Sequence, residues 1–488
     1  MGELLLVSHR PDDPEAAARS RALRGLAGER GLGIVPLEPA SWMATAGPRH
    51  PTVTRAGAWT LIGDVLDRRA PDLSGVGPHD PLAFEKKLAA RFWGRFIGVR
   101  LGGARPPFAV LRDPSGGLEC VVWRQDGLTL IASFAPAWLV EHLRPPWRID
   151  RDRLARALVD PLAATGPLIH AFGSVPEADE RRWAEVLAAH LGIAVEAVPH
   201  ADAPLTGDLL ESASQGLRPG LNGLDHPHDL DWAMRITRAG LSAVMTGKGG
   251  DSLFQQATPE VFADRWRARG WRALFEPDTV RLAAANDRSV WSLLRQACVA
   301  TPDAALFPPR RGLAVPQADP VPPHPWLVDL APFGPAKRLQ IAGVADGVSR
   351  HGPSLLTGAV EVLHPFCAQP VVEACLALDC GLLTLGGRDR GLVRHAFSGR
   401  LPDPIVARRS KGDMSRVYGR RVADNLSLLR PWILHGRLAE MGLIDRASAE
   451  TLLSRESLMW RGRAGAILAT AAIEAWVRVW QRRLGGRR

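Results

Sequence analysis

The chain has 488 residues, more than one hydrophobic core usually accommodates, so two or three domains are expected. Hydrophobic residues make up 46% and charged residues 23%, a composition that excludes disordered and fibrous proteins. The formal net charge of +10 is carried mostly by arginine, which favours a solvated basic surface over a nucleic-acid partner, since no RRM, zinc-finger or basic-zipper pattern accompanies it. An attraction to acidic or phosphorylated substrates stays open.

Cysteine usage and apolar runs indicate the compartment. The cysteines are five in number and lack CxxC spacing, which argues against a disulfide framework or a zinc site. The apolar run in MGELLLVSH is too short for a signal peptide, and AGAILATAAIEAWVRVW is interrupted by Glu474 and Arg478. The second stretch predicts a buried amphipathic helix. We therefore expect a cytoplasmic protein with no membrane partner.

The chain up to about residue 145 carries short β signals. GELLLVSH predicts the first strand, and RFWGRFIGVRLG alternates as a strand does. FAVL, LECVVW and LTLIAS follow, separated by the turns RDPSGG and RQDG. Residues 91–133 are therefore expected to form consecutive antiparallel hairpins.

PSGGLEC, residues 114–120, is close to the SGGxDS loop with which one class of ATP-dependent ligases binds pyrophosphate. Such a loop follows a strand and opens a helix, whereas CVVWRQDGLTLIAS continues as β structure. Glu119 stands in place of Asp, and Cys120 in place of Ser. We interpret this stretch as a hairpin turn.

From about residue 150, helices alternate with isolated short strands, which is typical of an α/β domain. PLIHAF predicts a strand, and the helix after it has a Ser174–Glu177 capping box and a stop at Gly192. DLDWAMRITRAG predicts a helix that leads into the strand SAVMT. The proline-rich stretch 303–335 predicts a connector, and the rest of the chain reads as mostly helical.

VMTGKGGDSLF, residues 244–254, is a better candidate for phosphate chemistry. An apolar strand runs into a glycine-rich loop, and DSLFQQA is expected to start a helix capped by Asp251 or Ser252. Lys248 would add positive charge, and Asp251 could hold Mg²⁺. Because glycine has no side chain, an anion could come close to the backbone at Gly247, Gly249 and Gly250. Taken alone, such a loop is also an ordinary connection.

Together with four other segments of the sequence, this loop resembles the motifs of the asparagine synthetase superfamily. TGKGGDSLF is similar to the family's S-G-x-G-A/G-D-E-L/I-F segment, and HPFCAQPVVEACLAL to its P-F-L-D-x-x-V/L-x-E block. IHAFGSVPEADERRWAEVLAAHLGI looks like its second strand and helix, with the acidic pair Asp179-Glu180. RDRGLVRHAFSGRLPDPIVARRSKG resembles the ending K-x-x-L/V-R-x-A…LP-x-x-I/V-x-R-x-K-x-G. RDPSGGLECVVW is similar to a hairpin of its glutaminase-like domain.

The resemblance implies a fold for each part of the chain. Residues 1–147 would form an α+β, β-rich domain of the class II glutamine amidotransferase (Ntn) type. Residues 148–488 would form an α/β ATP-pyrophosphatase-like synthetase domain with a helical C-terminal part.

The resemblance also implies ATP and Mg²⁺ as cofactors and assigns roles to single residues. Lys411 would stabilise the acyl-adenylate transition state, with a solvated charge as the alternative. Phe172 would lie where the family's backbone meets adenine, with a core aromatic as the alternative. His364 and Cys367 have no partners at ligand spacing and are interpreted as structural.

Glutamine-dependent family members use an N-terminal cysteine as nucleophile, whereas this chain has Gly2. β-Lactam synthetases and lasso peptide cyclases also lack this cysteine. The sequences HPFCAQPVVE, GGRDRGLVRHAFSGRLP and RRSKGD look most like those of the cyclases. Such an enzyme would adenylate an Asp or Glu side chain of a precursor peptide, and the peptide's N-terminal amine would close a macrolactam. A leader peptidase and a leader-recognition protein are further partners that this branch implies.

A second departure concerns the pyrophosphate loop itself. No SGG occurs between Arg148 and His170, so the family's first strand, its SGGxDS loop and the following helix are expected to be missing. Three hypotheses remain: an active ligase, a non-adenylating protein that binds a peptide or partner, and a glutamine-hydrolysing asparagine synthetase. We expect weak or absent ATP–pyrophosphate exchange and no glutaminase activity.

Overall fold

The structure is a computed structural model. It describes residues 3–46, 51–70, 73, 81–100, 109–113, 117–145, 147, 149, 171–172, 179–192, 195, 197–221, 224–241, 243–299, 313–315, 324–349, 352–409, 415–461 and 463–485. The chain forms two compact units: Met1–Ile149 with Gln215–Pro219 and Trp480–Arg488, and Asp150–Ser214 with Gly220–Val479. Two short segments from later in the chain thus belong with the N-terminal unit.

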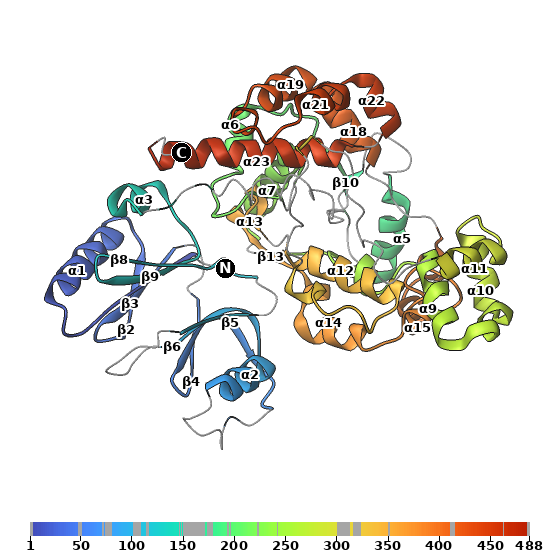
Figure 1. The fold of residues 1–488 in the computed structure, drawn as a ribbon, viewed down its shortest axis with the longest axis horizontal. Helices are drawn as coiled ribbons and strands as arrows, with labels where there is room; N and C mark the ends of the chain where they lie inside the picture. The colour runs from blue at the N-terminus through green and yellow to red at the C-terminus, as the bar shows by residue number, and fades with distance from the viewer. Residues whose placement is uncertain are drawn as a thin grey trace. The chain divides into compact units, whose positions relative to one another are not determined.

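In its described residues, the first unit has two antiparallel sheets and the helices α1 to α3 (Figure 1). The five-stranded sheet has the order β2-β3-β1-β9-β8, and the four-stranded sheet the order β4-β5-β6-β7. Its elements are β1 (Glu3–His9), α1 (Pro14–Glu29), β2 (Gly33–Glu38), β3 (Ser41–Ala46), β4 (Val53–Ala56), β5 (Trp59–Asp67), α2 (Pro81–Arg91), β6 (Phe92–Arg100), β7 (Ala109–Arg112), β8 (Val121–Gln125), β9 (Leu128–Ala132) and α3 (Ala137–Leu143).

The position of strand β1 between two cores explains why its sequence is continuously apolar. Leu4 and Leu6 pack into the core between the two sheets, together with Ile62 and Ile97 of the second sheet. Leu5 and Val7 face the other way, into the core that includes residues of α1. Both faces of the strand are therefore buried, which removes the usual polar alternation. Because α2 covers the outer face of the second sheet, the layers run helix, sheet, sheet, helix.

The expected hairpin at PSGGLEC is wrong. Strand β7 pairs with β6 in the four-stranded sheet, whereas β8 pairs with β9 in the five-stranded sheet. The segment between them is therefore a crossing from one sheet to the other. Asp113 supports the crossing, because its carboxylate accepts from the N–H groups of Phe96 and Gly117 at 3.3 and 3.4 Å. Residues 114–116 lie outside the described residues.

The second unit combines short parallel strand pairs with many helices. Its elements up to residue 299 are β10 (Ala171–Phe172), α5 (Arg181–Leu191), β11 (Val198–Pro199), α6 (Gly207–Ser212), α7 (His226–Arg238), β12 (Ala243–Met245), α8 (Gly250–Leu253), α9 (Pro259–Arg269), the 3₁₀ helix η2 (Gly270–Phe275), α10 (Pro277–Ala285) and α11 (Val290–Val299). Those that follow are η3 (Pro325–Leu327), α12 (Pro335–Ser349), α13 (Leu355–Ala359), β13 (Glu361–Leu363), η4 (Pro365–Cys367), α14 (Gln369–Leu376), α15 (Cys380–Leu383), α16 (Gly391–Ala396), α17 (Asp403–Ala407), α18 (Ser415–Asp424), α19 (Leu426–Leu434), α20 (Arg437–Glu440), α21 (Arg446–Leu452), α22 (Arg455–Arg461) and α23 (Ala464–Arg483).

The strands of the second unit form two separate parallel pairs, β10–β11 and β12–β13. Within the described ranges no further strand joins either pair. Residues 151–170, which precede β10, and the predicted capping box Ser174–Glu177 lie outside the described residues. Helix α5 ends as expected, at Gly192 in the left-handed conformation.

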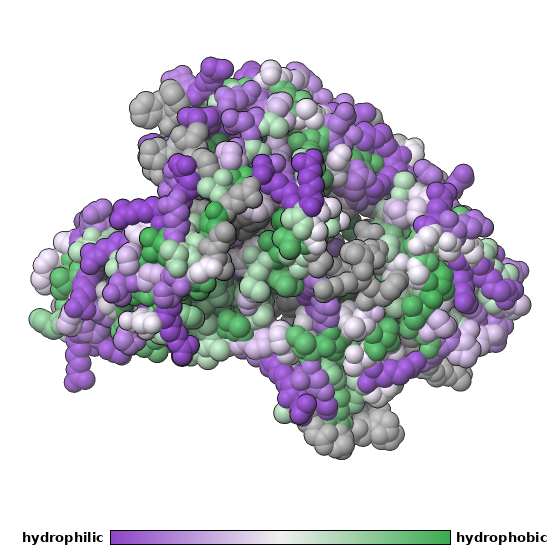
Figure 2. Space-filling model, turned by 180° about the vertical axis from the view of Figure 1, so that it is seen from behind, coloured by the Kyte–Doolittle hydropathy of each residue, from purple (hydrophilic) through white to green (hydrophobic). Residues whose placement is uncertain are grey.

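The predicted amphipathic helix is α23, which is lined by buried alanines and aliphatic residues. Among the described residues, no helix is both long and apolar enough to cross a bilayer. Hydrophilic side chains cover much of the face in Figure 2, with smaller hydrophobic areas between them.

Candidate functional site

The glycine-rich loop lies at the carboxyl end of a parallel strand pair. Strand β12 pairs with β13 so that Met245 is opposite Leu363, and the N–H of Thr246 donates to the carbonyl of Leu363 at 2.9 Å. The loop after β12 and the segment 364–367 after β13 therefore leave the sheet side by side. The carboxyl edge of a parallel sheet is where α/β proteins place ligands.

Hydrogen bonds join this loop to the segment after β13. The hydroxyl of Thr246 lies 2.5 Å from Nδ1 of His364, and it also accepts from the N–H of Lys248 at 3.3 Å. The thiol of Cys367 donates to the carbonyl of Lys248 at 3.6 Å. His364 and Cys367, interpreted from the sequence as structural, are thus the contacts that shape the loop.

The glycines of the loop have different environments. Gly249 has a φ of +88°, and a Cβ there would lie 2.9 Å from Sγ of Cys367. A Cβ on Gly250 would lie 3.1 Å from the ring of Phe366, whereas one on Gly247 would meet nothing within 4 Å. Gly249 is therefore required by the packing and the backbone conformation, Gly250 is closely packed, and Gly247 faces open space. Gly247 is the position at which a phosphate could approach the backbone.

Lys248 does not extend into solvent, because it is only 8% exposed. Its positive charge lies close to Cys367, but burial dominates and raises the pKa of that thiol. Cys367 is therefore a protonated, packed thiol and not an activated nucleophile.

Asp251, the expected Mg²⁺ ligand, pairs with Arg390: Oδ1 lies 3.0 Å from Nη1. The backbone of Arg390 is fixed by a hydrogen bond from its N–H to the carbonyl of Gln255 at 2.9 Å. No cluster of three or more His, Cys, Asp or Glu side chains suited to a metal occurs in the described part of the chain. One carboxylate that is shared with an arginine does not fit a metal held by the protein alone.

The helix after the loop is shorter than expected. Helix α8 covers Gly250–Leu253 with Gly249 at its N-cap, so neither Asp251 nor Ser252 caps it. It ends because Gln255 has a φ of +64°, which a helix cannot include. The amide of Gln340 then donates to the carbonyl of Leu253 at 2.7 Å and satisfies one of the last carbonyls.

Lys411 lies outside the described residues, but the chain that leads to it is held from two sides. On one side, Arg408 forms an ion pair with Glu180, and its guanidinium lies 4.9 Å from the ring centroid of Trp183. On the other side, Arg388 and Arg394 donate to the carbonyls of Val406 and Ile405, at 2.9 Å each. The segment up to Arg408 is therefore firmly placed.

The remaining predicted residue, Phe172, lies in strand β10, where it is opposite Pro199 of β11. Its side chain is outside the described residues. The structure thus brings Gly247, Lys248 and Asp251 together with the segment after β13.

Two features escaped the sequence-based prediction. Arg390 belongs to the quoted block RDRGLVRHA, but nothing in a run of arginines marks which one turns toward Asp251. Glu180 was noted as part of an acidic pair, yet its partner Arg408 is 228 positions away in the chain. Only the folded structure identifies such partners.

No curated protein matches this chain. Residues 345–478, which include β13, Arg390 and Arg408, match the protein family described as asparagine synthase.

Proposed function

We propose that the protein is an ATP-dependent ligase that forms carbon–nitrogen bonds. The observation that carries the proposal is the asparagine synthase domain at residues 345–478, because this superfamily consists of ATP-dependent amide-forming ligases. The glycine-rich loop lies outside that range but is hydrogen-bonded to it through Thr246 and His364. The loop and the segment after β13 are therefore in direct contact, which supports a role for both in the same site.

The reaction that we propose begins at a carboxylate side chain of an Asp or Glu in a precursor peptide. A carboxylate oxygen attacks the α-phosphorus of ATP, and pyrophosphate leaves. The peptide's N-terminal amine then attacks the acyl carbon, loses a proton and displaces AMP, which closes a macrolactam. Because both reacting groups belong to one peptide, amide formation becomes intramolecular.

The residues take the following roles in this proposal. The open backbone at Gly247 approaches the phosphates, and buried Lys248 supplies positive charge beside them. Lys411 stabilises the charge that develops on the acyl-adenylate transition state, and β10 at Phe172 contributes to the adenine site. Mg²⁺ would neutralise phosphate charge and arrives bound to ATP, since the described side chains do not hold it alone. A leader peptidase and a leader-recognition protein would act on the same peptide in the cytoplasm.

A non-adenylating protein that binds a peptide or partner is the second candidate. Two observations favour it: Asp251 is engaged by Arg390, and the parallel strands form two separate pairs within the described residues. A glutamine-hydrolysing asparagine synthetase is the third.

ATP–pyrophosphate exchange with the purified chain and an acid-containing precursor peptide distinguishes these functions. The ligase predicts weak, peptide-dependent exchange that is lost in Lys411→Ala. Peptide binding without any exchange would instead establish the second candidate. Release of glutamate from glutamine would instead establish the third candidate.

A further inference from the structure

The helices α9, η2, α10 and α11 form a subdomain with large aromatic side chains on its outside. Its core is well filled by residues such as Phe262 and Leu282, which are fully buried. By contrast, Phe275 is 84% exposed and Trp271 is 66% exposed. Trp271 is nevertheless held in place, because its ring packs edge-on against Trp266 at 5.2 Å between centroids. Fixed aromatic side chains on a surface are typical of binding sites.

A pocket opens beside these aromatic residues. It has a volume of 510 Å³ and is lined by Ala268, Arg269, Arg272 and Glu276. Arg272 follows Trp271 directly in the chain and lies three residues before Phe275. Residues three apart share one face of a 3₁₀ helix, so the guanidinium of Arg272 and the ring of Phe275 lie on the same side of η2. We call Trp271, Arg272, Phe275 and this pocket the η2 surface.

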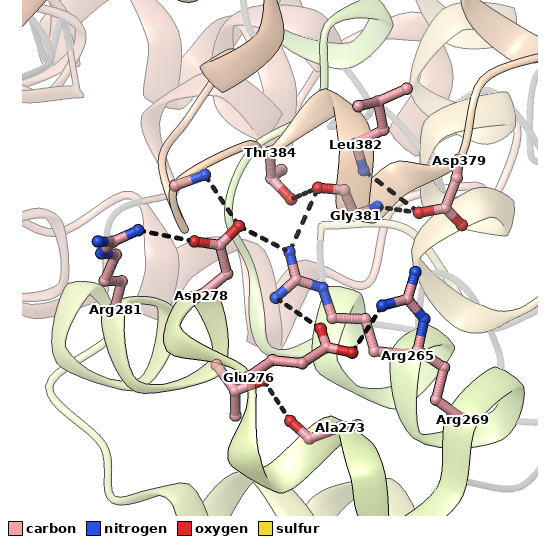
Figure 3. Close-up of polar contacts among 12 residues, drawn as sticks. Arg265, Arg269, Ala273, Glu276, Asp278, Arg281, Asp379, Gly381, Leu382 and Thr384 are labelled. Carbon is pink, nitrogen blue, oxygen red and sulfur yellow. Dashed lines mark hydrogen bonds and ion pairs between the residues drawn. The ribbon is translucent and has the colours of Figure 1, made fainter.

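Two acids of the subdomain, Glu276 and Asp278, are already paired with arginines of the same subdomain (Figure 3). Glu276 pairs with Nη1 of Arg269 at 2.7 Å and with Nη1 of buried Arg265 at 3.9 Å. Asp278 pairs with Arg281 at 3.0 Å and with Arg265 at 3.7 Å.

Arg272 takes part in none of these pairs, and no acid of the described residues lies within ion-pair distance of it. Residues 259–299 contain seven arginines against five acids. The η2 surface therefore carries uncompensated positive charge next to exposed aromatic rings.

We propose that the η2 surface binds an acidic segment of a partner polypeptide, in which a carboxylate and an apolar side chain are close in sequence. The planar fork of Arg272 suits a single carboxylate, which it can bind through two parallel hydrogen bonds. Trp271 and Phe275 supply the apolar contact area that anchors an interface. Glu276 in the pocket wall disfavours closely spaced phosphates, so a peptide fits better than a nucleic acid or an anionic lipid surface.

Fluorescence anisotropy of a labelled synthetic peptide of alternating glutamate and leucine tests this proposal, with the full chain and without ATP. Binding is expected at low salt and should weaken as salt is added. We expect Arg272→Glu to weaken binding by about tenfold or more, and Phe275→Ser by a similar factor. Arg446→Glu reverses an exposed arginine of α21 and should bind the peptide as the unmodified chain does.

Three results would overturn the proposal. The first is no measurable binding of the glutamate peptide, and the second is equal binding of a glutamine–leucine peptide. The third is preferential binding of phosphatidylglycerol vesicles or of a single-stranded oligonucleotide that Arg272→Glu abolishes. If Arg272→Glu does not fold, Arg272→Gln removes the charge with less perturbation and must still weaken binding. Because ATP is absent, these outcomes do not depend on the proposed ligase activity.

Discussion

The carboxylate of Asp251 and the guanidinium of Arg390 form an ion pair of 3.0 Å between two segments that the sequence places far apart. The pair joins the start of α8 to the residue before α16. It determines how the glycine-rich loop is charged, because it offsets the only carboxylate that directly follows the glycines.

This pair should contribute little to stability, since about 30% of each side chain is exposed. A double-mutant cycle with Asp251→Asn and Arg390→Gln should give a coupling free energy of no more than about 1 kcal/mol in urea unfolding. If Asp251 also contacts Mg²⁺–ATP, Asp251→Asn should lose exchange activity while Arg390→Gln retains part of it. Equal loss in both variants would show that the ion pair itself is what the site needs.

Gly249 and Gly247 provide a matched test of the loop. Gly249→Ala should destabilise the protein by about 2 kcal/mol, because the backbone is left-handed there and the new methyl group would meet Cys367. Gly247→Ala should change stability by less than about 0.5 kcal/mol, since its Cβ position is open. Thermal and urea unfolding measure both. A Gly249→Ala variant as stable as the unmodified chain would contradict this loop conformation.

Glu180 and Asp179 are neighbours with different roles. Glu180 pairs with Arg408 where both side chains are mostly buried, so Glu180→Gln should cost about 2 kcal/mol. It should also lower ATP–pyrophosphate exchange, because the segment before Lys411 loses an anchor. Asp179 pairs at the surface with Arg181, two residues further along the chain, so Asp179→Asn should cost less than about 0.5 kcal/mol. Similar costs for the two variants would contradict the anchoring role.

Glu474 interrupts the apolar face of α23 for a structural reason. It is fully buried and accepts hydrogen bonds from the N–H groups of Arg437 and Leu438, at 2.7 and 2.8 Å, and from Nε of Arg478 at 2.6 Å. Glu474→Ala leaves these donors without their acceptor and should cost about 3–5 kcal/mol.

A matched control is Glu440→Ala, which removes only an exposed ion pair with Arg437. It should cost less than about 1 kcal/mol. Chemical denaturation of the two variants compares them directly, and a small loss for Glu474→Ala would refute its capping of α20.

A buried and a half-buried histidine should make the protein sensitive to acid. Burial lowers the pKa of His226 to about 4 and that of His228 to about 3, and the neighbouring His200 stacks on His228 at 4.2 Å. The unfolded chain therefore takes up protons below about pH 6.5 that the folded chain does not, so stability falls as the pH drops from 6.5 toward 4.

His226→Phe should remove one part of this loss. Between pH 7 and pH 5, unfolding free energies of the variant should fall by about 2 kcal/mol less than those of the unmodified chain. The exposed His435 serves as the control, and His435→Phe should leave the pH profile unchanged. An unaltered profile in His226→Phe would mean that this imidazole is protonated in the folded protein.

Much of the local structure followed from the sequence alone. The strands β1, β6, β8 and β9, the helix α7 and the strand β12 lie where short apolar runs, alternation and helical periodicity predicted them. These patterns are local, because they record only which side of an element is buried. The glycine-rich loop was found in the same way, from a short apolar strand followed by residues without side chains.

Tertiary structure decided what those patterns cannot encode. A strand's alternation does not name its partner, which is why β7 and β8 were expected in one hairpin but belong to different sheets. The partners of Asp251 and Glu180 are arginines that lie far away in the sequence. Many other arginines in the chain carry the same charge, so the sequence alone does not identify which one forms each pair. The sequence thus determined the helices and strands and the location of the glycine-rich loop. Long-range pairing determined which strands join and that the carboxylate after the loop, Asp251, is offset by Arg390.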